Sequence, residues 1–100
     1  MDIPVDLTPE LAALRTEIDA CDAEIVALLS RRARAVAQIG RIKHTAGLPI
    51  YDPRRETEIF ANLGRFNPGP LDDGALRRIY ERLLDESRRL ERQGQGEGSR

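Results

Sequence analysis

Two cations on one predicted helix are the first residues of this sequence that suggest chemistry. Arg32 interrupts a series of apolar positions. Burying a guanidinium there costs several kcal/mol of desolvation unless an anion pairs with it. Lys43 follows at nearly the same azimuth, about 16 Å further along the helix axis. Two long side chains can shorten that gap, so the pair is suited to gripping one small anion. The alternative is that both cations are solvated at the helix edge.

Polar residues four positions apart occur twice more. Asp52 and Glu56, with Arg55 between them, stand at a predicted helix start, where a cap and an exposed ion pair are the simpler interpretation. Ser87 and Glu91 intrude on the apolar flank of a later helix. There, a serine bonded to its own backbone and a fraying helix end are equally good interpretations.

Arg15 is too far from Lys43 to share a ligand with it inside one chain. The two are separated by about 42 Å along a single helix, so Arg15 either is a solvated charge or serves a site on a second chain. The sequence shows no nucleophile–base pair and no metal-ligand cluster, and its single histidine, His44, stands at a helix end that favours a positive charge. These residues suit a small polyanion whose reaction needs positioning and electrostatic stabilisation.

Three helices of unequal length are predicted to carry these residues. The first spans residues 8–44, with Thr8 as cap and Pro9 at its first position; the second spans 53–65 after Asp52, and the third begins at Asp72 or Asp73 and ends near residue 92. Residues 1–7 are expected to form an N-terminal arm and residues 93–100 a disordered tail. We therefore predict an all-α fold.

The first helix carries an apolar stripe too long for two short helices to cover, so we expect a second copy of the chain to cover part of it. The stripe consists of Leu11, Leu14, Ile18, Cys21, Ile25, Leu28, Ala35, Ile39 and Ile42, with Arg32 among them. Cys21 is expected to be a buried structural thiol. Gly40, inside the helix, is expected to allow a close backbone approach or to leave room for a ligand.

Composition excludes several classes of protein. The chain has 100 residues, enough for one domain, with 16 basic and 17 acidic residues and no Trp. A near-neutral charge argues against a nucleic-acid binder. The sequence contains no apolar run long enough to span a bilayer and no signal peptide, so we expect no membrane association and a cytoplasmic location.

Several segments together resemble the AroQ-type, all-helical chorismate mutases. The resemblance covers residues 11–92 and is carried by LRTEID (14–19), LLSRR (28–32), GRIK (40–43), PIYDPRRE (49–56) and LLDES (83–87). It implies an intertwined homodimer of three-helix subunits that needs no cofactor. It also implies conversion of chorismate to prephenate, by a Claisen rearrangement, in phenylalanine and tyrosine biosynthesis.

The resemblance assigns roles to the cations. Arg32 resembles the arginine that grips one substrate carboxylate from within the subunit, and Arg15 resembles the arginine donated by the partner chain. Lys43 matches the lysine that donates to the substrate's ether oxygen and a carboxylate.

The remaining polar residues match further positions of the family. Asp52 and Glu56 correspond to the pair near the substrate hydroxyl, and Arg55 and Ser87 to positions on the carboxylate side. Glu91 stands where the family often has a glutamine that donates to the ether oxygen. The resemblance therefore implies that Lys43, Glu91 and Arg32 are catalytic.

Two other functions compete with this assignment. One is an isochorismate pyruvate lyase on the same fold, which uses similar cations. The other is a non-catalytic dimerisation or regulatory module associated with a partner enzyme of the shikimate pathway.

Overall fold

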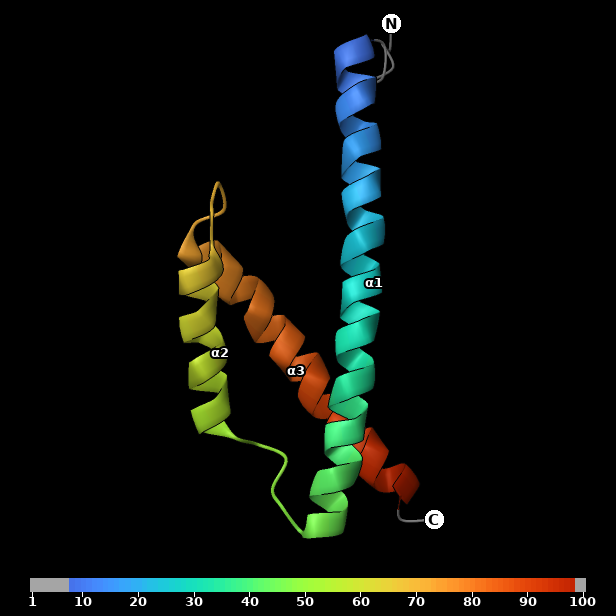
Figure 1. The fold of residues 1–100 in the computed structure, drawn as a ribbon, viewed down its shortest axis with the longest axis vertical. Coiled ribbons are helices and arrows are strands. Elements are labelled where there is room, and N and C mark those ends of the chain that lie inside the picture. The colour runs from blue at the N-terminus through green and yellow to red at the C-terminus, as the bar shows by residue number, and fades with distance from the viewer. Residues whose placement is uncertain (1–7, 99–100) are drawn as a thin grey trace, which may run out of the picture. The chain divides into compact units, whose positions relative to one another are not determined.

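Three helices follow one another along the chain. A computed structural model describes residues 8–98, in which α1 spans Pro9–Ala46, α2 spans Pro53–Phe66 and α3 spans Asp73–Gly98, with no strand in that range (Figure 1). The predicted all-α fold is confirmed. Helix α3 continues to Gly98, beyond the end near residue 92 that the sequence predicted, because extending an existing helix needs no new nucleation. The predicted N-terminal arm lies outside the described residues.

Local capping explains where each helix starts. The Thr8 hydroxyl accepts a hydrogen bond from the Leu11 amide at 3.3 Å, the Asp52 carboxylate accepts one from the Arg55 amide at 3.1 Å, and the Asp72 carboxylate accepts one from the Ala75 amide at 2.7 Å. Each cap satisfies an amide that the first helical turn leaves without a partner.

Gly47 ends the first helix. Its φ of 69° is left-handed backbone, which favours glycine, and the next amide, that of Leu48, donates to the Lys43 carbonyl at 2.8 Å. The chain thus turns into the connector that leads to α2.

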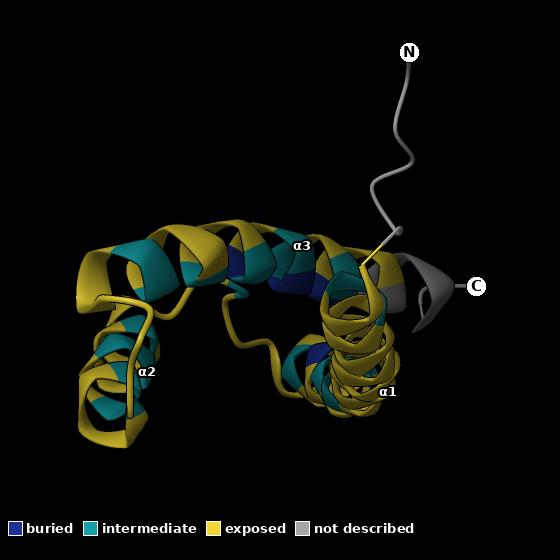
Figure 2. Ribbon diagram, turned by 90° about the horizontal axis from the view of Figure 1, so that it is seen from above, coloured by how far each residue is buried: buried dark blue, intermediate teal, exposed yellow. Residues whose placement is uncertain are grey.

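The structure divides into two compact units, with the boundary between Arg32 and Ala33 inside α1. In the second unit, the end of α1 is joined by α2 and α3, and α2 packs on α3 (Figure 1). Among residues 33–93, the part of this unit whose burial is described, the buried residues lie on α3 and on the part of α1 beside it: Gly40, Leu84, Ser87 and Glu91 (Figure 2). Two of these four residues are polar, which marks this packed surface as the place to look for a site.

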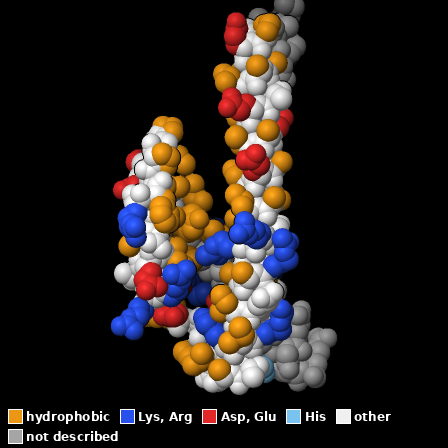
Figure 3. Space-filling model, in the orientation of Figure 1, with side chains coloured by type: hydrophobic (Ala, Val, Ile, Leu, Met, Phe, Trp, Pro, Cys, Tyr) orange, Lys and Arg blue, Asp and Glu red, His pale blue; other side chains and the backbone are white. Residues whose placement is uncertain are grey.

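The first unit leaves most of its large apolar residues exposed. Leu14 and Ile18 are each 57% exposed and Leu28 is 59% exposed, and Figure 3 shows apolar side chains along this stretch of α1. Cys21 is exposed as well, so the prediction of a buried thiol is wrong for the single chain. Burial needs a covering surface, and the described part of this unit is one helix. Among the residues described, no helix combines the length and apolarity needed to cross a membrane.

Candidate active site

Lys43 and Glu91 meet where α1 and α3 cross. The Lys43 ammonium lies 2.7 Å from Oε1 of Glu91, and the two side chains are only 17% and 10% exposed. Nζ of Lys43 also donates a hydrogen bond to the Ile50 carbonyl at 2.9 Å. Glu91 Oε1 is buried and accepts no hydrogen bond in the structure. Its contact with the Lys43 ammonium is therefore an ion pair whose geometry is not that of a hydrogen bond. A partly buried cation is therefore held beside a buried carboxyl group.

Gly40 explains how the two helices come this close. A Cβ atom at this position would lie 2.8 Å from both the Cα and the carbonyl oxygen of Glu91. Such distances are too short for real carbon atoms, so only glycine allows this approach. Of the two predictions for Gly40, the close backbone approach is confirmed. Lys43 lies three residues further along the same helix, which brings its side chain to Glu91.

Ser87 shares the buried face of α3 with Glu91. Its hydroxyl donates to the Leu83 carbonyl at 2.9 Å, as the simpler interpretation of a serine in a helix predicted. It is 8% exposed and lies one turn before Glu91. A hydroxyl, a carboxyl group and an ammonium group are thus gathered in one packed region.

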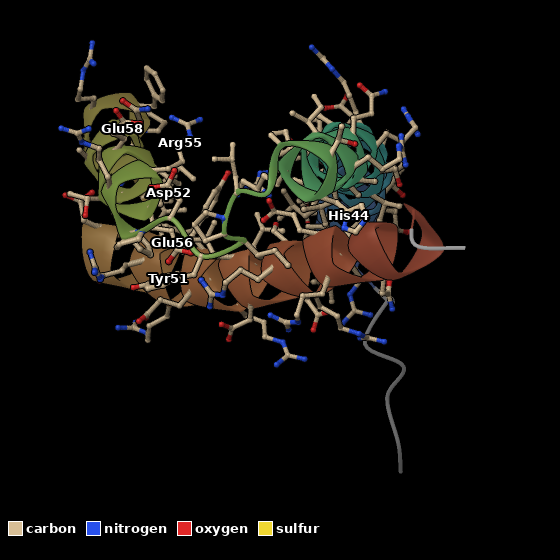
Figure 4. The ribbon with its side chains drawn as sticks, turned by 90° about the horizontal axis from the view of Figure 1, so that it is seen from below. His44, Tyr51, Asp52, Arg55, Glu56 and Glu58 are labelled. Atoms are coloured by element: carbon tan, nitrogen blue, oxygen red, sulfur yellow. The ribbon has the colours of Figure 1, made fainter. Side chains whose placement is uncertain are left out.

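Asp52 and Arg55 have structural contacts at the start of α2. Asp52 caps the helix, and Nη1 of Arg55 lies 3.2 Å from Oε1 of Glu58 in an exposed ion pair. Figure 4 shows Arg55 and Glu58 on the side of α2 away from α3. The cap is the one that the simpler interpretation of this segment predicted, whereas the exposed ion pair of Arg55 is formed with Glu58, a residue that the sequence analysis did not single out.

Glu56 has a different environment, because it pairs across to α3. Its carboxylate accepts a hydrogen bond from Arg88, whose other terminal nitrogen donates to Asp85. The Arg88 guanidinium also lies 5.8 Å from the centre of the Tyr51 ring. Tyr51 and Glu56 lie on the α3 side of the start of α2 (Figure 4). Arg88 therefore joins α2, α3 and the connector between α1 and α2.

The neighbouring carboxylates of Glu56 and Asp85 raise the pKa of Arg88. The hydrogen bond to Glu56 raises the pKa of Arg88 above its ordinary value, and the charges of Glu56 and Asp85 act in the same direction against the lowering effect of burial. The guanidinium therefore stays charged. Sequence reasoning missed this residue, although Leu84, Arg88 and Glu91 follow the three- and four-residue spacing of one helix face.

Arg15 and Arg32 belong to the first unit. Both lie on α1, where Arg15 is exposed and Arg32 is half-buried. The substrate-binding roles expected of Arg15 and Arg32 come from the family resemblance of the sequence.

The described side chains contain no group of three or more His, Cys, Asp and Glu residues that could hold a metal ion. What the second unit gathers is a set of hydrogen-bonding and charged groups. Such a set can bind an anion and stabilise charge that develops on an oxygen atom.

Comparison with known proteins gives a consistent result. The family described as chorismate mutase type II matches residues 14–92. The bifunctional chorismate mutase/prephenate dehydratase of Aquifex aeolicus is 42% identical over 87 residues, which cover 83% of this chain but 24% of that protein. The chain thus spans about a quarter of the length of such curated relatives.

Solved structures agree with the sequence match. Chorismate mutase (form II) from Thermus thermophilus is 43% identical, with a TM-score of 0.81 over 83% of this chain and 94% of that one. Chorismate mutase from Helicobacter pylori, solved in complex with prephenate, is 33% identical, with a TM-score of 0.79 over 87% of this chain and 94% of that one. The family match, which spans most of the chain, and these two structures confirm the resemblance inferred from the sequence: the chain belongs to the chorismate mutase type II family.

Proposed function

We propose that this chain catalyses the rearrangement of chorismate to prephenate. The observation that best supports the proposal is the meeting of Lys43 and Glu91 at 2.7 Å from two helices, in a largely buried place. Membership of the chorismate mutase type II family supports the same reaction. The product would feed the biosynthesis of phenylalanine and tyrosine.

The reaction requires no covalent catalysis by the protein. In this 3,3-sigmatropic rearrangement the carbon–oxygen bond of the ether breaks while a new carbon–carbon bond forms, and no intermediate with the enzyme is made. The dianion has to fold into a chair-like shape, and negative charge grows on the ether oxygen as the bond breaks. Binding the folded shape and stabilising that charge are the two tasks left to the protein.

Lys43 and Glu91 are the groups we assign to the ether oxygen. An ammonium that is already fixed by the Ile50 carbonyl can donate to that oxygen without rearranging. Glu91 can donate only when its carboxyl group is protonated. Ser87 and Arg55 are assigned to the carboxylate side, and Asp52 and Glu56 to the substrate hydroxyl, on the strength of the family motifs.

We further propose a homodimer in which Arg32 binds one substrate carboxylate from within its own chain and Arg15 is donated by the partner chain. The exposed apolar side chains of the first unit support this assembly, since a second copy would remove them from water. An active site completed by both chains would make turnover depend on dimerisation.

A chorismate consumption assay with identification of the product tests the proposed activity. We expect prephenate to accumulate as chorismate disappears, with no added metal or cofactor. Isochorismate serves as the second substrate: release of pyruvate from it, without turnover of chorismate, would indicate a lyase instead. If the chain acts on neither chorismate nor isochorismate, the result would indicate a non-catalytic binding or regulatory module.

A further inference from the structure

Arg88 differs from two other arginines of α3, Arg82 and Arg89, in where its side chain lies. Its side chain is 25% exposed, whereas that of its neighbour Arg89 is 64% exposed and that of Arg82 is 76% exposed. Arg89 and Arg82 pair with Glu86, on their own helix. Arg88 also reaches Glu56 on α2, 32 residues away in the sequence, so it alone of these three makes a contact between helices.

The Arg88 guanidinium is fixed at both ends of its planar fork. Nη1 donates to the Glu56 carboxylate and Nη2 donates to Asp85, while the Tyr51 ring lies 5.8 Å from its central carbon. A planar group held by two carboxylates has little rotational freedom left. The carboxylate of Glu56 is consequently held in a defined orientation, although glutamate side chains otherwise keep considerable rotamer freedom.

The positive charge of Arg88 also affects how Glu56 interacts with the substrate. Glu56 is a carboxylate that the proposed function places beside a doubly negative substrate, and two like charges at close range repel each other. A paired guanidinium offsets that repulsion, because it adds a positive charge within contact distance of the carboxylate. A substrate that approaches Glu56 therefore meets a carboxylate paired with a guanidinium, which it shares with Asp85, and not an isolated negative charge.

We propose that Arg88 is a positioning residue for the proposed reaction: it orients the Glu56 carboxylate toward the substrate hydroxyl and offsets part of that carboxylate's repulsion of the dianion. The proposal rests on the proposed function. Arg88 acts through Glu56 and is not itself assigned a contact with the substrate.

The test compares steady-state kinetics of Arg88→Met with those of Arg89→Met, which removes a cation one position away without touching Glu56. We expect KM for chorismate to rise about fivefold in Arg88→Met while kcat changes by less than about twofold, since a repulsion felt equally by substrate and transition state alters binding alone. Arg89→Met should match the wild type. Arg88→Lys, which keeps the charge, should recover part of the affinity.

A double variant separates positioning from a merely structural role. Glu56→Gln removes the negative charge, so adding Arg88→Met to it should not raise KM further. An unchanged KM in Arg88→Met, or an equal increase of KM with and without Glu56→Gln, would overturn the proposal while the mutase function stands. Absence of turnover in the wild type would overturn the proposed function and this inference with it. If Arg88→Met does not fold, Arg88→Gln replaces it in every comparison.

Discussion

At the scale of single residues, Lys43 is the best-defined group of the candidate site. The Ile50 carbonyl and the Glu91 carboxyl group hold its ammonium from two sides, and little of the side chain is exposed. A donor fixed in advance loses little free energy to reorganisation when charge develops nearby. This arrangement is what a group acting mainly on a transition state requires.

Replacing Lys43 by alanine should lower kcat about a hundredfold, equivalent to about 3 kcal/mol, because one charge-stabilising donor is lost. Circular dichroism should show an unchanged helix content. Arg41→Ala, which removes an exposed cation two residues away, is the control and should keep wild-type turnover. A Lys43→Ala enzyme with near-normal kcat would refute the assignment.

Replacing Glu91 by glutamine tests whether this position donates a hydrogen bond to the ether oxygen. A carboxyl group can donate only when it is protonated, whereas an amide always carries donor hydrogens. The Glu91→Gln enzyme should therefore have a kcat at pH 7 equal to or above that of the wild type, as measured by chorismate consumption. A large loss of kcat in Glu91→Gln would count against Glu91 as a donor.

Residue types and spacing identified some of the residues that the structure brings together, but not all of their partners. Lys43 and Glu91 were singled out as polar residues on or beside apolar surfaces, and the structure brings them together. Arg88 was missed because a long cation between two polar positions looks the same in the sequence whether it is solvated or paired across to another helix. Cys21 was predicted to be buried but is exposed in the single chain, because periodicity identifies an apolar face but not what covers it.

At the scale of elements, the crossing of α1 and α3 determines the site geometry. Gly40 packs directly on the backbone of Glu91, so the separation of the two helices is set by the absence of one carbon atom. Helix starts could be predicted, because Thr8, Asp52 and Asp72 act on their own first turns. The crossing itself depends on tertiary packing, which local signals do not encode.

Gly40→Ala should separate the helices and disturb the pair formed by Lys43 and Glu91. We expect a loss of about 1–3 kcal/mol in the free energy of unfolding, since the added methyl group would overlap backbone atoms that cannot rotate away. Urea denaturation measures the stability, and kcat should fall in the same variant.

Gly64→Ala in α2 is the matched control. The nearest atom to a Cβ there is a carboxylate oxygen of Asp73, at an ordinary 3.9 Å, so this change should stabilise the helix by about 0.5–1 kcal/mol. Equal destabilisation by both changes would mean that the close approach at Gly40 is unimportant.

At the scale of the whole molecule, the question is how many chains complete one site. The first unit exposes a row of large apolar side chains that a second copy could cover. It also carries Arg15 and Arg32, which the proposed function assigns to sites on different chains.

Mixing inactive variants tests this sharing. Arg15→Ala and Arg32→Ala chains, unfolded and refolded together, should regain about one quarter of wild-type activity. Half of the dimers would be hybrids, and each hybrid would have one intact site of two. Arg32→Ala mixed with Lys43→Ala should regain none, because both residues are assigned to the same chain of each site. No recovery in the first mixture would show that Arg15 is not donated by the partner.

The exposed Cys21 offers a direct view of the proposed assembly. It is the single thiol of the sequence, and it lies in the row of side chains that a second copy would cover. A maleimide reagent should therefore label dissociated chains quickly and associated chains slowly, so that the labelling rate falls as protein concentration rises. One sulfur atom would then report the dissociation constant without any substrate present.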